Sequence, residues 1–252
     1  MRNVSIIALL VGSVLAGVAC GDDAGEAAPT SEPAAATPAA PAREPLEPLP
    51  TVQTDARKVV LGRRLYHDTQ LSGDGTLSCA SCHSLDNGGA EPRRTSIGIR
   101  GQVGPINSPT VLNSGLNFVQ FWDGRAATLE EQAAGPVTNP IEMGATWEQV
   151  IPRLNTDGTY REAFAAIYPE GVTKDTITDA IAEYERSLLT PSRFDRYLRG
   201  DRNAITAEER RGYETFKSVG CTACHQGANI GGSMYQKMGL VRNYFELRGG
   251  EL

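Results

Sequence analysis

The chain has 252 residues, a length that accommodates one or two domains. Its 24 Lys and Arg against 30 Asp and Glu give a formal net charge of −6. Proteins that bind the phosphate backbone of a nucleic acid usually carry an excess of basic residues, and this chain has an excess of acidic ones. We therefore expect no nucleic-acid partner. Several of the acids precede residue 50, which brings the remainder closer to neutrality.

Residues 1–20 have the pattern of an export signal, with Arg2 followed by an apolar run over 4–18 and small residues before Cys20. The apolar run is short for a membrane span. We therefore predict export to the periplasm. Cys20 is the one cysteine outside the paired motifs described below, and residues 17–20 resemble a lipoprotein cleavage box, although Gly17 stands where that box usually has Leu. Two alternatives remain open: acylation that tethers the protein to a membrane through Cys20, or plain cleavage that leaves Cys20 removed or inert.

Residues 21–50 are rich in Ala, Pro, Glu and Thr and contain little to bury, which predicts a solvated linker. From residue 51 the pattern becomes that of short helices and long loops, with few alternating β-branched runs. The first helix is expected over 55–67, directly before a pair of cysteines. The fold class predicted for this part is mainly α.

Two copies of Cys-x-x-Cys-His are the most informative feature of the chain: Cys79, Cys82 and His83, and then Cys221, Cys224 and His225. This is the attachment signature of a c-type haem, in which both thiols join the porphyrin and the adjacent His becomes the proximal iron ligand. A redox disulfide or a zinc site is the alternative. Neither is favoured, because both pairs carry the His and no His-x₃₋₅-His arm completes a tetrahedral zinc site.

Between the motifs lies a stretch rich in Gly, Pro and Asn over 87–109, followed by Gln-Phe-Trp-Asp-Gly-Arg at 120–125. Long irregular segments inside compact domains are more often functional than accidental. Capping-box patterns at 128–131, 146–149 and 206–209 then predict helix starts. A longer helix with Ile177, Ile181, Tyr184 and Leu188 on one face is expected to end at Thr190-Pro191.

A helix is expected over 207–217, with Gly220 as its stop, directly before the second motif. A helix that leads into the haem motif is what a small cytochrome c domain uses. We therefore predict two tandem haem domains, over 51–195 and 196–252. No other repeat is apparent.

A family resemblance rests on motifs that follow one another in a fixed order. These are Leu71-Ser72, the first haem motif, Gly98, residues 107–113, 120–126, Gln132, Gly135-Pro136, 139–143, 194–198, the second haem motif and Gly231-Gly232. Together they closely resemble the bacterial dihaem cytochrome c peroxidases, whose relatives include the MauG-type proteins. The resemblance covers roughly residues 55–252.

The resemblance implies a role for each matching residue. His83 would hold the low-potential, peroxidatic haem and His225 the high-potential haem that accepts electrons. Trp122 would bridge the two haems, while Gln132 and Glu142 would line the distal side of the first haem. Asn107 would contribute to a calcium ion between the domains.

The chemistry of peroxide cleavage agrees with a carboxylate in the place of Glu142. Heterolysis of the O–O bond requires a proton to move from the inner to the outer oxygen, which a carboxylate can do as general base and then acid. The alternative for Glu142 is a surface residue in a turn, and for Trp122 plain core packing. Arg125 is expected to pair with a haem propionate or a carboxylate.

This sequence departs from the family pattern at the first haem. Many members carry a His after Ser-x-Gly that ligates this haem in the oxidised state, but here the position is Ile99. The chain has three His, and His67, the one outside the motifs, is interpreted as a surface residue. The first haem is then expected to be five-coordinate or water-ligated without reductive activation.

The second departure is at the end of the chain, where 27 residues follow His225. This is short for wrapping the distal face of a haem, so the second domain is expected to be truncated. Met234 and Met238 are interpreted as core or loop residues rather than haem ligands.

The sequence thus predicts a peroxidase that reduces hydrogen peroxide with electrons from a small periplasmic cytochrome or copper protein. An electron-transfer cytochrome and a MauG-like oxidase that modifies another protein are the alternatives. The assembly is left open between a monomer and a homodimer.

Overall fold

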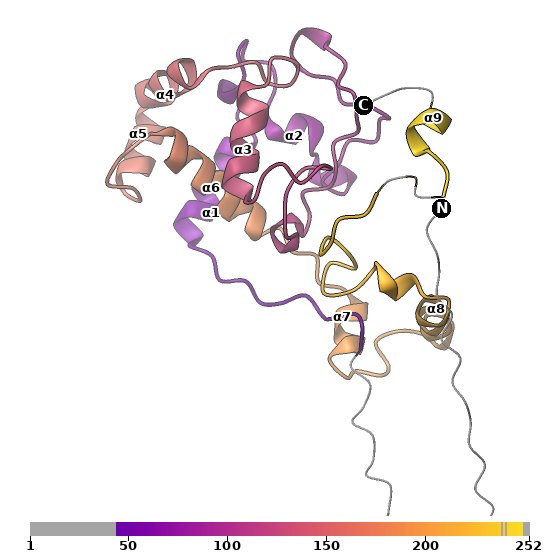
Figure 1. The fold of residues 1–252 in the computed structure, drawn as a ribbon. Helices are drawn as coiled ribbons and strands as arrows, with labels where there is room; N and C mark the ends of the chain where they lie inside the picture. The colour runs from indigo at the N-terminus through magenta and orange to yellow at the C-terminus, as the bar shows by residue number, and fades with distance from the viewer. Residues whose placement is uncertain (1–43, 238, 240, 249–252) are drawn as a thin grey trace, which may run out of the picture. The chain divides into compact units, whose positions relative to one another are not determined.

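A computed structural model describes residues 44–237, 239 and 241–248, so the predicted signal peptide, Cys20 and Met238 lie outside the described residues. The predicted mainly helical fold is confirmed, because strand pairing among the described residues is limited to isolated bridges. No helix in this part of the chain combines the length and the apolar character that crossing a membrane requires. The elements, seen in Figure 1, are α1 (Ala56–Tyr66), η1 (Thr69–Leu71), α2 (Cys79–Cys82), η2 (Leu85–Asn87), η3 (Ile99–Gly101), η4 (Ser114–Leu116), α3 (Leu129–Thr138), α4 (Trp147–Thr156), α5 (Gly158–Ala165), α6 (Lys174–Arg186), α7 (Arg193–Leu198), α8 (Ala207–Ser218), η5 (Cys221–Ala223) and α9 (Tyr244–Arg248).

The helices begin where side-chain caps satisfy their free backbone N–H groups. Asp55 caps α1 by accepting a hydrogen bond from the backbone of Arg57. The predicted starts of α3, α4 and α8 are confirmed, with Thr128, Thr146 and Thr206 as the N-caps. A side-chain oxygen at this position replaces a hydrogen bond that the first turn of a helix otherwise lacks.

Helix α6 ends at Arg186, four residues before the predicted end at Thr190. After Arg186 the backbone N–H groups of Ser187 and Leu188 bond to carbonyls three residues earlier, and Asn113 binds the segment beyond them. The backbone N–H of Asn113 donates to the carbonyl of Leu188, and its side-chain carbonyl accepts from the N–H of Thr190. These bonds hold the segment that follows the helix.

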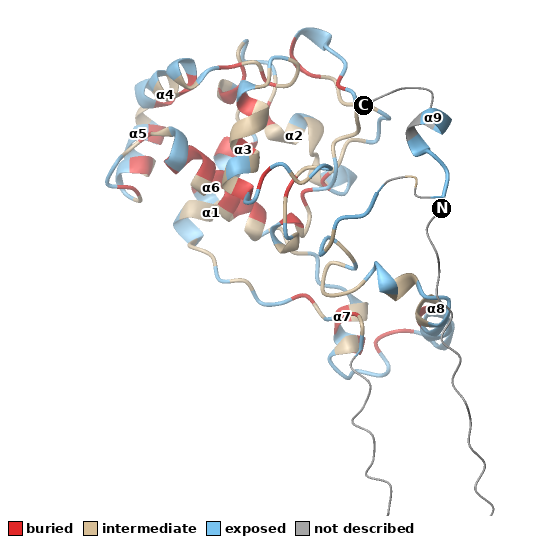
Figure 2. Cartoon of the chain, viewed as in Figure 1, coloured by how far each residue is buried: buried red, intermediate tan, exposed pale blue. Residues whose placement is uncertain are grey.

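The main core forms around α6, which packs against α1 and α3 (Figure 2). Ile177 and Ile181 from α6 are fully buried there, as the periodicity predicted. Helices α1 and α6 approach closely at Gly62, where a Cβ atom would lie 1.8 Å from the carbonyl oxygen of Ala180. The absence of a side chain at this residue therefore sets the distance between the two helices.

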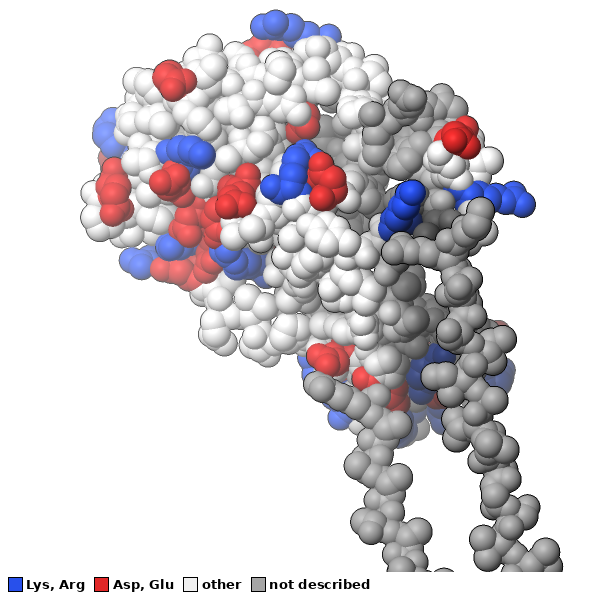
Figure 3. All heavy atoms as spheres, viewed as in Figure 1, with Lys and Arg blue, Asp and Glu red and all other residues white. Residues whose placement is uncertain are grey.

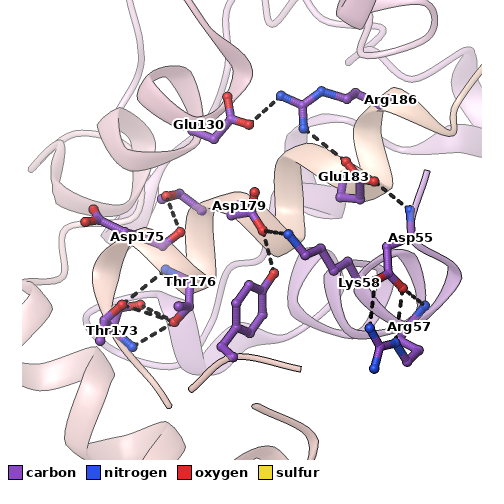
Figure 4. A network of polar contacts seen from close by, with 12 residues as sticks. Asp55, Arg57, Lys58, Glu130, Thr173, Asp175, Thr176, Asp179, Glu183 and Arg186 are labelled. Atoms are coloured by element: carbon purple, nitrogen blue, oxygen red, sulfur yellow. Dashed lines mark hydrogen bonds and ion pairs between the residues drawn. The ribbon is translucent and has the colours of Figure 1, made fainter. Parts of the chain in front are cut away.

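A network of charged side chains, drawn in Figure 4, holds the outer side of α6 to its neighbours. Arg186 bonds to Glu130 of α3 and, at 3.1 Å, to Glu183 of its own helix. Lys58 of α1 bonds to Asp179 of α6 at 2.7 Å. On the face drawn in Figure 3, basic and acidic side chains of the described residues are correspondingly interspersed.

A separate cluster forms around α7 and α8, with Tyr197 and Tyr213 in its centre. Leu46 belongs to it and Leu49 is also buried, so residues 44–50 are docked although they were predicted to end the solvated linker. These leucines supply the apolar surface that the rest of the linker lacks. The predicted domain boundary after residue 195 falls inside α7, and the division into two haem domains stays a prediction.

Candidate functional site

The first Cys-x-x-Cys-His motif forms the single turn α2 and the residue that caps it. Ser78 begins the turn, and Cys79 and Cys82 come three residues apart, which places them on one face of a helix. Their thiols are free, with no disulfide between them. Tyr66, fully buried in α1, donates a hydrogen bond of 2.6 Å to the carbonyl oxygen of His83 and so ties the motif to the core.

The imidazole of His83 is oriented by backbone carbonyls. Its Nδ1 atom lies 2.9 Å from the carbonyl oxygen of Pro109 and 3.3 Å from that of Gly89. A carbonyl only accepts hydrogen bonds, so Nδ1 carries the proton and Nε2 keeps its lone pair. Burial lowers the pKa of His83, which also favours the neutral ring that a metal requires.

The second motif repeats this arrangement in the C-terminal part of the chain. Gly220, at φ +85°, ends the α8 segment, and η5 then carries Cys221 into Cys224 and His225. The Nδ1 atom of His225 lies 2.9 Å from the carbonyl oxygen of Ile230, which again leaves Nε2 free. These two cysteines are also free thiols.

The residues of both motifs fit a haem group. A ligating histidine characteristically donates its second ring N–H to a carbonyl or carboxylate, which fixes the tautomer and the ring plane. Both motifs combine that arrangement with two unpaired thiols. The carbonyls of Pro109 and Ile230 were not found from the sequence, because every residue has a backbone carbonyl and no local pattern marks these two.

Glu142 lies in the turn that follows α3 and faces the first motif. Asn139 donates a hydrogen bond of 2.7 Å to Glu142 Oε1. Burial raises the pKa of Glu142, while the bond from Asn139 and the charge of Arg125 partly oppose that rise. The charge of Glu142 also contributes to the raised pKa of the Cys82 thiol, after burial and Glu91, so the two side chains interact electrostatically. Glu142 is thus a partly buried carboxyl within electrostatic range of Cys82.

The loop that carries Ile99 is fastened to the same turn. The backbone N–H of Ile99 donates to the carbonyl of Glu142 at 2.7 Å, and the Ile99 side chain is 2% exposed. Gly98 permits this approach, since a Cβ there would lie 1.9 Å from the carbonyl oxygen of Ile141. An apolar side chain therefore lies beside Glu142 where many family members have an iron ligand.

His67 is an exposed residue at the C-terminal end of α1, as interpreted from the sequence. Its Nδ1 atom contacts the carbonyl oxygen of Arg63, one turn earlier in its own helix, at 2.9 Å. Its ring lies near those of Tyr66 and Tyr184, with centroids 5.2 and 6.4 Å away.

Gln132 and Trp122 occupy two different surroundings. Gln132 is partly buried on α3, the helix that leads to Glu142. Trp122 is 56% exposed, and its role as a bridge between the haems stays a prediction. Its indole N–H donates to the carbonyl oxygen of Asn107 at 3.0 Å.

The Trp122 loop is shaped by its neighbours in sequence. Phe121 has φ +67°, and its ring lies against α3 at Gly135, where a Cβ would be 3.2 Å from Phe121 Cζ. Arg125 lies over the Phe121 ring at 3.5 Å and pairs with Asp123 at 2.8 Å. Arg125 was predicted to pair with a haem propionate or with a carboxylate, and in the structure it pairs with the carboxylate of Asp123.

Asn107 acts as a brace between loops. Its side-chain amide donates to the carbonyl oxygens of Glu91 and Arg93 at 2.7 and 2.6 Å, and its own carbonyl accepts from Trp122. No group of three or more His, Cys, Asp or Glu suited to a metal ion occurs among the described residues. Calcium binding by Asn107 stays a prediction.

Met234, interpreted from the sequence as a core or loop residue, lies in the segment after the second motif. Its sulfur accepts a hydrogen bond of 3.2 Å from Gln236.

The helical fold and the paired motifs define a protein built to carry two haems. A sequence profile of the family described as di-haem cytochrome c peroxidase matches residues 56–203, and the chain belongs to this family. The chain is 52% identical over 204 residues to cytochrome c peroxidase Ccp of Escherichia coli, covering 80% of this chain and 44% of that protein. It is 48% identical over 206 residues to cytochrome c551 peroxidase of Nitrosomonas europaea, covering 81% of this chain and 62% of that protein.

A solved structure is similar as well. The crystal structure of a MauG-like protein associated with microbial copper homeostasis superimposes with a TM-score of 0.64 at 32% identity, covering 81% of this chain and 63% of the other. The chain thus spans about half the length of the curated relatives it matches.

Proposed function

We propose that the protein is a c-type dihaem peroxidase that reduces hydrogen peroxide to water with electrons from a small periplasmic redox protein. The observation that carries the proposal is the partly buried carboxyl of Glu142, held by Asn139 beside the first of two matched haem motifs. The names of the relatives support the same reaction. A pure electron carrier has no use for a buried general base next to one haem.

The free thiols in each motif support covalent attachment of both haems. Cys79 and Cys82 would bind the first haem and Cys221 and Cys224 the second, with His83 and His225 as the iron ligands through Nε2. A haem bound at the first motif supplies the iron at which peroxide is taken up and reduced. The carbonyls of Pro109 and Ile230 keep each ring in the tautomer that binds iron.

Glu142 moves the proton in this proposal. Its carboxylate takes the proton from the inner oxygen of hydrogen peroxide and returns it to the outer oxygen, which leaves as water. The hydrogen bond from Asn139 to Oε1 keeps one carboxyl oxygen fixed, so that Oε2 is the atom that exchanges the proton. The raised pKa brings the carboxyl closer to the working pH, where a general acid and base is most efficient.

The other residues position the reactants and the electrons. Gln132 would contact peroxide from α3, and buried Ile99 would keep the distal side apolar and free of an iron ligand. Trp122 would carry electrons between the haems. The donor would be a small cytochrome c or copper protein, and Asn107 would contribute to a calcium site. The protein would be exported to the periplasm, where either acylation of Cys20 tethers it to a membrane or cleavage removes that residue.

Steady-state reduction of peroxide by the purified holoprotein, with a reduced small cytochrome c as the donor, tests this function. We expect turnover far above that of free haem at the same concentration. Activity no greater than that of free haem would instead support an electron-transfer cytochrome.

The structural similarity to a MauG-like protein gives a second candidate, an oxidase that modifies a protein substrate. The two functions differ in where the electrons come from. Rapid oxidation of the small donor protein by peroxide favours the peroxidase. Peroxide consumption that depends instead on oxidation of residues in a partner protein, detected by mass spectrometry, favours the oxidase.

A further inference from the structure

The segment that follows the second haem motif lies against the segment that precedes Trp122. The side-chain amide of Asn229 donates to Asn117 Oδ1 at 2.6 Å and approaches the carbonyl oxygen of Asn113 at 3.4 Å. The backbone N–H of Phe118 donates to the carbonyl oxygen of Gly232 at 3.0 Å. Residues more than 100 positions apart in the chain are therefore joined by backbone and side-chain hydrogen bonds.

Tyr235 extends this junction to the Trp122 loop itself. Its hydroxyl lies 3.4 Å from the carbonyl oxygen of Gly124, and its ring meets that of Phe118 edge to face with centroids 5.1 Å apart. A Cβ at Gly124 would lie 2.4 Å from the Tyr235 hydroxyl oxygen and 2.6 and 2.8 Å from two ring carbons. The Tyr235 ring thus lies directly on the backbone of Gly124, at a place that only glycine leaves open.

Gly124 is two residues from Trp122, so Tyr235 acts on the loop that presents the indole. Trp122 is more than half exposed, and its indole Nε1–H donates a hydrogen bond to the carbonyl oxygen of Asn107. The surrounding core therefore contributes little to its position. Asn107 holds one side of the loop, and Tyr235 holds the other.

The same segment also orients the second haem ligand. Ile230, five residues before Tyr235, supplies the carbonyl that accepts from His225 Nδ1. One short segment therefore sets both the plane of the His225 ring and the position of the Trp122 loop. A shift of the segment would change the two together.

We propose that Tyr235 is a positioning residue for electron transfer between the two haems. It holds the Trp122 loop, through Gly124, at a fixed place relative to the segment of the second haem. The inference rests on the proposed function, in which electrons pass from the second haem to the first. The ring of Tyr235 is the part that matters, because the hydroxyl contact of 3.4 Å is at the outer limit of a hydrogen bond.

The test is a single-turnover measurement on the holoprotein. The second haem is reduced, peroxide is added, and the oxidation of the second haem is followed by its absorbance. We expect Tyr235→Ala to slow this oxidation severalfold, because the rate of electron transfer falls as the indole moves away from the haems that it connects. Tyr235→Phe, which keeps the ring, should stay close to the wild-type rate.

Phe118→Ala tests the same junction from the opposite side, because it removes the ring that meets the Tyr235 ring edge to face. Its effect should resemble that of Tyr235→Ala, and the double variant should be no slower than either single variant, as is expected of residues that share one contact. This variant also keeps the proposal testable if Tyr235→Ala fails to take up haem. Val241→Ala is the matched control, since Val241 is an exposed apolar residue that, like Tyr235, follows the second motif in the chain.

The reduction potentials and absorbance spectra of both haems are measured in every variant. A slower transfer at unchanged potentials supports a positioning role. A Tyr235→Ala rate equal to that of the wild type, or a loss explained entirely by a changed potential of the second haem, overturns it. If the wild-type protein itself passes no electrons from the second haem to peroxide, the proposed function fails instead.

Discussion

Replacement of Glu185 by Gln should make the protein markedly more stable at alkaline pH. Glu185 lies on α6, is 5% exposed, and interacts electrostatically with the thiol of Cys79 in the first haem motif. Burial raises its pKa to about 8, with the charge of Arg186 opposing this rise and that of Glu130 adding to it. The carboxyl is thus held in its neutral form in the folded protein at pH 7.

The magnitude follows from the two proton affinities of this group. The folded carboxyl keeps its proton up to about pH 8, whereas the unfolded one releases it near the ordinary value of 4.5. Between these values the unfolded chain binds fewer protons than the folded one, so the free energy of unfolding falls as pH rises. At about 1.4 kcal/mol for each tenfold change in proton affinity, the loss reaches about 5 kcal/mol above pH 8, and about 3 kcal/mol of it develops between pH 5 and pH 8.

Urea unfolding of the two proteins at pH 5 and at pH 8 measures this difference. The stability of Glu185→Gln relative to the wild type should increase by about 3 kcal/mol between the two pH values, because the neutral amide does not titrate. Glu170→Gln, at an exposed position, controls for the loss of one carboxylate. An unchanged difference between Glu185→Gln and the wild type at the two pH values would refute the reasoning.

Three further predictions concern the reaction. Glu142→Gln should retain both haems and slow the reaction with peroxide by about 10²- to 10⁴-fold, the usual contribution of general acid–base catalysis, in stopped-flow measurements; an unchanged rate removes Glu142 from the mechanism. Trp122→Ala should slow inter-haem electron transfer while peroxide binding survives, and a fast single turnover in this variant would make the bridge assignment wrong. Because Ile99 stands in place of a ligating His and His67 is exposed, low-temperature EPR of the oxidised holoprotein should show a high-spin first haem that reacts with peroxide without prior reduction. A spectrum with only low-spin signals of bis-His type would contradict this.

The features that the sequence could predict are those whose physical causes are local. Thr146 and Thr206 start helices because a side-chain oxygen satisfies a nearby backbone N–H within the same turn. The spacing of the two cysteines before His83, and again before His225, is likewise visible in five consecutive residues. The family resemblance added Glu142, whose charge in the structure influences the pKa of the Cys82 thiol.

Contacts between distant parts of the chain determined the rest. Leu46 and Leu49 look like linker residues until the cluster around Tyr213 gives them a surface to cover. The segment that follows α6 is held by Asn113, more than 70 positions earlier, which bonds to Leu188 and Thr190. No local pattern could predict either result.

The sequence by itself determined that two histidines are available to bind haem iron, since the motif names them. Only the tertiary structure decided which nitrogen of each ring is free, because the carbonyls of Pro109 and Ile230 reach Nδ1 through the folding of their loops. The same holds for Tyr235, whose contact with Gly124 joins segments that are 111 residues apart. Backbone carbonyls and glycines occur throughout the chain. A particular carbonyl or glycine therefore acquires a role only when folding brings a particular side chain into contact with it.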